Sequence, residues 1–106
     1  MAADRLHVLI YGLQVNDDDL YGRYREAMAP ILRRYGGAFV YDFVVSRVLR
    51  RPVDAPINRL FSMTFPEKDA AERFFSDAEY RKIRGELFES AVGSVTRLAA
   101  YDGSIG

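Results

Sequence analysis

The 106-residue chain contains no cysteine, no tryptophan and only one histidine. The absence of cysteine excludes disulfides, thiolate zinc sites and cysteine nucleophiles, and a single histidine excludes a multi-histidine metal site. The 15 basic and 15 acidic residues cancel, whereas electrostatic binding of nucleic acid normally requires excess positive charge. The composition therefore predicts no nucleic-acid partner, and no sequence motif indicates a metal or a cofactor.

Long apolar runs are also missing. The longest runs, such as residues 8–11 and 43–45, are far shorter than the roughly 20 residues of a membrane-spanning helix. The first five residues lack the basic and apolar regions of a signal peptide. We therefore expect a cytoplasmic protein with no membrane partner. The 49% of apolar residues and 28% of charged residues are typical of one globular domain over residues 1–106.

The hydrophobic periodicity predicts four strands and two helical regions. A helix is expected from Leu20, after an acidic turn that supplies capping side chains, and it ends at Gly36 and Gly37. A second helical region follows Pro66, restarts at a capping box of residues 76–79 and stops at Gly93. The strands are expected at residues 6–13, 38–49, 57–65 and 94–101.

This β-α-β-β-α-β order predicts an α+β, ferredoxin-like fold, in which both helices cover one face of an antiparallel sheet. Both faces of the predicted strands are apolar, with Val8 and Ile10 on one face and Leu9 and Tyr11 on the other. Because two helices cover only one face of a sheet, the second apolar face needs a partner. We therefore expect a homodimer in which two open sheet faces pack together.

Three groups of residues together resemble a known family. They are Asp19…Tyr24…Pro30…Tyr35-Gly36-Gly37, Phe65-Pro66 with Ala70-Ala71, and Phe74-Phe75-Ser76-Asp77-Ala78-Glu79-Tyr80. In combination they resemble the domain-of-unknown-function 1330 family of the dimeric α/β-barrel superfamily, over roughly residues 6–101. The resemblance implies a ferredoxin-like protomer whose sheet pairs with that of a second copy to form a barrel, with a pocket in or beside it.

The sequence departs from this family at one position. The family often carries an arginine about two turns after the tyrosine of its Glu-Tyr motif, and here Arg84 either takes that role or the role is absent. The superfamily includes cofactor-independent monooxygenases, haem-degrading enzymes, lactone isomerases and chlorite dismutases. The resemblance therefore implies a fold without fixing a reaction.

Two residues are candidates for catalysis. His7 carries the one imidazole, which suits proton transfer near neutral pH or haem ligation, and the alternative is a strand-end histidine near solvent. Asp42 lies between Tyr41 and Phe43 in an otherwise apolar strand. Asp42 and Arg97 could form an ion pair. Such a pair would have either a structural or a catalytic role.

Polar and aromatic residues of the strands are the candidates for ligand binding, because pockets are mostly apolar with a few convergent polar groups. Their faces cannot be assigned from the sequence, since a slip of one residue in the register reverses each of them. The alternative is that several point outward or satisfy one another in an interface. The candidates are Tyr11, Tyr41, Ser62, Thr64 and Arg97.

Four arginines make the connection between the second and third strands basic. Guanidinium groups suit a rim that attracts carboxylates or phosphates. A solvated loop, or a contact with the acidic turn of a partner subunit, explains them more simply. They are Arg47, Arg50, Arg51 and Arg59.

These observations predict a homodimer that binds a small, partly apolar organic molecule in a pocket lined by the sheet. One alternative is a cofactor-independent monooxygenase- or isomerase-type enzyme that uses His7, a tyrosine or Asp42 for proton transfer. Another is a non-catalytic dimeric interaction module.

Overall fold

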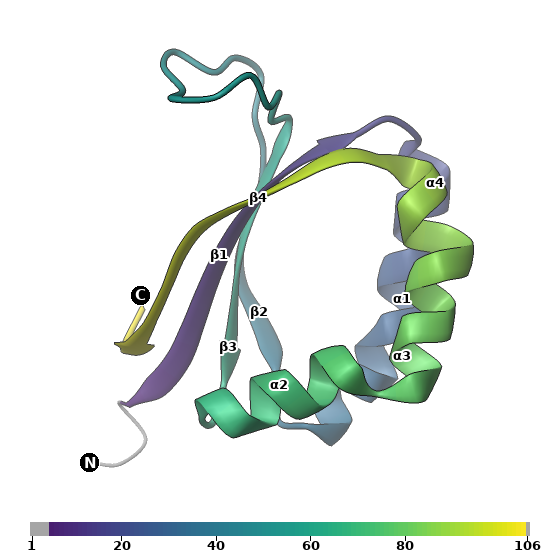
Figure 1. Ribbon diagram of the computed structural model, residues 1–106, viewed down its shortest axis with the longest axis vertical. Coiled ribbons are helices and arrows are strands. Elements are labelled where there is room, and N and C mark those ends of the chain that lie inside the picture. The colour runs from purple at the N-terminus through teal and green to yellow at the C-terminus, as the bar shows by residue number, and fades with distance from the viewer. Residues whose placement is uncertain (1–4, 106) are drawn as a thin grey trace.

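A computed structural model, which describes residues 5–105, joins four strands into one antiparallel sheet of order β2-β3-β1-β4 (Figure 1). This strand order and the α+β element order confirm the predicted ferredoxin-like fold class. The strands are β1 (Leu6–Val15), β2 (Ala38–Val44), β3 (Arg59–Phe65) and β4 (Val92–Gly103).

All the helices cover one face of the sheet, which we call the inner face (Figure 1). The second helical region is divided into four consecutive pieces, one of them a π-helical turn. Among the described residues, no helix is both long enough and apolar enough to cross a membrane. The helices are α1 (Asp18–Arg34), α2 (Lys68–Ser76), α3 (Ala78–Ile83), η2 (Arg84–Phe88) and α4 (Glu89–Ala91).

Both ends of α1 are capped as the sequence predicts. The Asp17 carboxylate accepts a hydrogen bond from the Leu20 N–H at 3.0 Å. At the other end Gly36 has φ +76°, its N–H donates to the Arg33 carbonyl at 3.0 Å, and the Gly37 N–H donates to the Leu32 carbonyl at 2.9 Å. These two bonds make a Schellman motif, which turns the chain directly into β2.

The break in the second helical region lies at Asp77, one residue later than the capping box predicts. The Asp77 carboxylate accepts from the Tyr80 N–H at 2.9 Å and so begins α3. Ser76 instead donates its hydroxyl back to the Glu72 carbonyl at 2.8 Å, which satisfies it within α2. The predicted restart is confirmed, but Ser76 as its cap is wrong.

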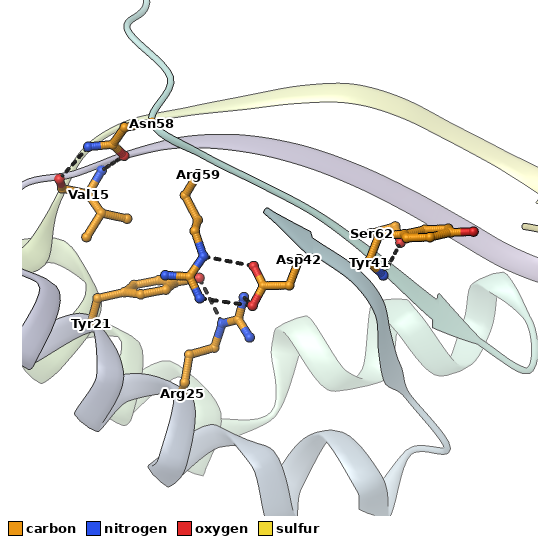
Figure 2. Close-up of polar contacts among 8 residues, drawn as sticks. All are labelled: Val15, Tyr21, Arg25, Tyr41, Asp42, Asn58, Arg59 and Ser62. Carbon is orange, nitrogen blue, oxygen red and sulfur yellow. Dashed lines mark hydrogen bonds and ion pairs between the residues drawn. The ribbon is translucent and has the colours of Figure 1, made fainter. Parts of the chain in front are cut away.

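The middle strands are shorter than predicted, because residues 45–58 leave the sheet as a long loop (Figure 1). Val44 pairs with Arg59, so β2 and β3 separate there. The Asn58 side chain bonds both the N–H and the carbonyl of Val15, at 2.7 and 2.8 Å, and ties the base of the loop to β1 (Figure 2). The predicted continuation of the second strand to residue 49 is wrong, because among the described residues the last backbone hydrogen bond between the two strands' ends is that of the Val45 N–H to the Asn58 carbonyl, at 2.8 Å.

The two faces of the sheet differ in what covers them. On the inner face Leu9, Leu13 and Phe65 are buried in the core under the helices. On the opposite, outer face Phe43 and Tyr101 are 52% and 38% exposed. The predicted second apolar face is therefore present, and among the described residues no helix covers it (Figure 1).

We predict that two glycine-to-alanine substitutions in and beside α1 have opposite effects. Gly36→Ala places a Cβ in the left-handed region and 2.7 Å from Pro66, so we expect a loss of about 1–3 kcal/mol. Gly22 is exposed inside α1 with no atom within 4 Å of an added Cβ, so Gly22→Ala should stabilise by about 0.5–1 kcal/mol. Urea unfolding followed by circular dichroism measures both, and equal effects would contradict the helix-end assignment.

Candidate functional site

A cavity of about 440 Å³ lies between the helices and the inner face of the sheet. Its wall is mainly aromatic and aliphatic, with Tyr11 and Phe61 contributed by the sheet. The polar side chains of the wall are Tyr11, Tyr21, Tyr24, Tyr80, Arg81, Arg84 and Glu89. A mostly apolar cavity with a few converging polar groups is the usual form of a small-molecule site.

Two buried tyrosines place hydroxyl groups in this wall. The hydroxyls of Tyr24 in α1 and Tyr80 in α3 are 2.8 Å apart. Burial raises the pKa of both phenols, so both keep their protons near neutral pH. Their mutual hydrogen bond uses one of the two hydroxyl protons, and within residues 5–105 neither hydroxyl has a further acceptor. One donor is therefore left for a bound molecule.

Positive charge surrounds the mouth of the cavity. Arg84, in the π-helical turn, lies over the Phe88 ring at 4.7 Å and 3.5 Å from the Glu89 carboxylate. Burial raises the pKa of Tyr11, and the charges of Arg97 and Arg84 partly oppose this rise. Tyr11 is therefore a neutral phenol between two guanidinium groups.

A second cavity of about 370 Å³ adjoins the first, and the two share Tyr11, Phe75 and Arg81. His7 and Arg97 also line it. His7 is only 8% exposed, and its Nδ1 is 2.9 Å from Oδ1 of Asp102 on β4. A carboxylate on Nδ1 orients the imidazole and leaves its other nitrogen to act on a ligand.

A charged cluster of Asp42, Arg59 and Arg25 lies between β2, β3 and α1 (Figure 2). Arg59 donates two hydrogen bonds to the Asp42 carboxylate, at 2.8 and 2.9 Å. Arg25 reaches the same carboxylate from α1, with Nη2 3.2 Å from Oδ2 but without hydrogen-bond geometry. The Arg25 guanidinium also lies 3.8 Å from the centre of the Phe39 ring, which lines the cavity.

This cluster answers what Asp42 pairs with. Its partners are Arg59 and Arg25, so the alternative pair with Arg97, on β4 at the opposite edge of the sheet, is not formed. The hydrogen bonds from Arg59 hold the pKa of Asp42 below its ordinary value. A carboxylate with a lowered pKa is a weaker base, which favours a structural role for this residue.

The other predicted site residues fall in two groups. Tyr11 lines both cavities and Arg97 lines the second. Tyr41, Ser62 and Thr64 line neither cavity. Ser62 and Thr64 pair with outer-face positions of β1, and the Tyr41 N–H donates to the Ser62 hydroxyl at 3.0 Å (Figure 2).

The four arginines of the basic connection between β2 and β3 also lie in two different places. Arg59 belongs to the Asp42 cluster. Arg47, Arg50 and Arg51 lie in the loop, where Arg51 forms an exposed ion pair with Asp54 at 2.7 Å. Within the described residues, no group of three or more acidic or histidine side chains is arranged to hold a metal ion.

Sequence reasoning left out the helix residues of the site. Tyr24 and Tyr80 fit the helical spacing and the family motif, and that spacing was the signal that they face the sheet. Arg84 was identified through the family resemblance, as the candidate for the role of the family's arginine. The π-helical turn that carries it has no local sequence signature. Such turns inside helices are frequent at functional sites.

Solved structures with the same fold share little sequence with this chain. A protein of unknown function from Rhodopseudomonas palustris is 17% identical, with a TM-score of 0.75 over 90% of this chain and 80% of that chain. A dabb family protein with a ferredoxin-like fold from Mesorhizobium loti is 12% identical, with a TM-score of 0.66 over 96% and 99% of the two chains.

SnoaB, a cofactor-independent oxygenase from Streptomyces nogalater, is 14% identical, with a TM-score of 0.54 over 92% and 94% of the two chains. These likenesses show a shared fold and transfer no activity. Among curated proteins, no sequence matches the chain. The profile of one family, described as a domain of unknown function (DUF1330), matches residues 8–100, nearly the whole chain, and the chain belongs to this family.

Proposed function

We propose that this protein is a homodimer that binds a small, partly apolar organic molecule in the cavity between its helices and the inner face of its sheet. The observation that supports this most is the cavity itself, because about 440 Å³ lies within the usual range of small-molecule sites. Aromatic rings such as Phe61 and Phe88 provide apolar contact area for the bound molecule. The polar groups of Tyr80 and Arg84 can orient it through hydrogen bonds. The cytoplasmic location stays a prediction.

Blocking the mouth of the cavity should abolish binding. Val95 lines the cavity and is 46% exposed, so Val95→Trp fills the opening without burying a new polar group. A library of small aromatic fragments, screened by saturation-transfer NMR, should give hits with the wild type and lose them with this variant. Val53→Trp, at a 58% exposed loop position outside the cavity, is the matched control and should keep the hits. Hits that persist in Val95→Trp would contradict a site in the cavity.

The outer face supports the dimer. Its exposed aromatic side chains include Phe43, Tyr41 and Tyr101. The Tyr41 and Phe43 rings stack at 5.8 Å, so they present one flat apolar surface. Exposed aromatic surface of this kind on a sheet face often marks an interface. A second copy of the sheet supplies the same surface in return, as two-fold symmetry requires.

A charge on the outer face should separate the two copies. In light scattering at micromolar concentration, we expect the wild type to have the mass of a dimer and Phe43→Asp that of a monomer. Val44 is the control, because it is the next residue in β2, 82% exposed, and pairs on the inner-face side with Arg59. Val44→Asp should remain dimeric. A monomeric wild type would refute the dimer but leave the ligand site standing.

The His7–Asp102 pair favours a second candidate function, an enzyme of the isomerase or cofactor-independent oxygenase type. Both reactions begin with removal of a proton from the substrate, and a carboxylate-oriented imidazole suits that step. The pair lies at the end of the second cavity, which meets the first at Tyr11. A molecule that extends past Tyr11 would bring an acidic C–H toward His7.

Deuterium exchange tests this candidate directly. We expect the wild type to accelerate exchange of the protons beside the carbonyl of 1-tetralone in heavy water, followed by NMR. His7→Asn should reduce the catalysed rate by about 100-fold or more, and Asp102→Asn by a smaller factor. Asp69→Asn, which removes only an exposed ion pair with Arg73, is the control. A rate unchanged in His7→Asn, or no acceleration by the wild type, would remove the enzyme interpretation for ketones of this kind.

A further inference from the structure

The polar groups of the first cavity are donors gathered on one side. Tyr80 and Arg84 are four residues apart, so consecutive turns of α3 and η2 carry both into the wall. The Tyr24 hydroxyl joins them from α1, 2.8 Å from that of Tyr80. This group of three residues, which we call the donor cluster, combines a guanidinium with one hydroxyl proton that lacks an acceptor among the described residues.

Little in the protein neutralises this cluster. Glu89 is the only acidic residue in the cavity wall, and it is 3.5 Å from Arg84 with a side chain 64% exposed. That exposed contact is weak and occupies one of the five N–H groups of the guanidinium. Arg81 also lines the wall and has no ion-pair partner within residues 5–105. The mouth of the cavity therefore carries net positive charge in a chain whose total charge is zero.

We infer that the ligand of this cavity is an aromatic carboxylate, whose anionic end binds the donor cluster and whose ring packs against Phe61 and Phe88. This inference rests on the proposed binding function and narrows its ligand class. A planar carboxylate has two acceptor oxygens and matches the fork of a guanidinium. A dianionic phosphate is a poorer match, because the cluster supplies one guanidinium that is already shared with Glu89.

The rest of the wall fits the ring of such an acid. Phe88 and Tyr24 are 4.9 Å apart at 56°, and Phe88 also supports the Arg84 guanidinium on its face. An aromatic ring beside Phe88 therefore lies next to the charge that holds its carboxylate. Tyr21 and Phe61 continue the aromatic wall away from the mouth.

Two probes of the same shape and different charge test the inference. In isothermal titration calorimetry at neutral pH, we expect 2-naphthoate to bind the wild type roughly 10- to 100-fold more tightly than 2-naphthamide. Arg84→Gln should lower the affinity for naphthoate by about tenfold or more and leave that for naphthamide within about threefold. Lys82→Gln, which removes an exposed cation two residues away and outside the wall, is the matched control and should change neither affinity.

Each outcome decides a different claim. Equal affinities for naphthoate and naphthamide in the wild type would overturn the carboxylate inference and leave the binding site intact. Naphthoate affinity unchanged in Arg84→Gln would overturn the role of the donor cluster. If neither probe binds the wild type, the proposed binding function fails for rings of this size, and the inference falls with it. If Arg84→Gln does not fold, the comparison of the two probes on the wild type still decides the inference.

Discussion

The carboxylate of Asp77 stabilises the break between α2 and α3. The position of Tyr80 in the cavity wall depends on where this break lies. The carboxylate caps α3 through the Tyr80 N–H and accepts from the Tyr35 hydroxyl at 2.6 Å, which joins the break to the end of α1. The Tyr35 hydroxyl lowers the pKa of Asp77, so the carboxylate stays charged. Tyr80, three residues on, then reaches the Tyr24 hydroxyl. These hydrogen bonds thereby connect α1 with the second helical region above the sheet.

The arginines near the two sides of the cavity differ in how far acidic side chains compensate them. On the β2 side, Asp42 neutralises Arg59 and partly neutralises Arg25, and the Arg25 guanidinium covers Phe39. The one acidic partner of Arg84 among residues 5–105 is the exposed Glu89. Two similar clusters of arginines thus differ in their acidic partners. The compensated cluster packs behind Phe39, outside the cavity wall, whereas Arg84 is part of the wall, which is the basis for the proposed anionic ligand.

The sequence was sufficient to predict the fold. It was not sufficient to predict which face of the sheet each strand residue occupies. The order of strands and the caps at Asp17 and Gly36 depend on local chemistry, which the sequence displays directly. The side of the sheet reached by Tyr41 and Asp42 depends on an irregularity of β2, whose register with β3 shifts between Phe39 and Asp42. A bulge changes which face each later residue takes, and no composition or spacing reveals it. Tyr11 and Tyr41 look equivalent in the sequence for this reason, yet only Tyr11 lines the cavity.

The 14 phenylalanines and tyrosines are divided between the two faces of the sheet, which explains how one small domain holds so many. Rings such as Phe61 line the cavity on the inner face, whereas Phe43 and Tyr41 remain exposed on the outer face. Phe43 lies on the outer face of β2 and outside the cavity wall, whereas the donor cluster lies on the helices, so the proposed association and the proposed binding can be measured independently.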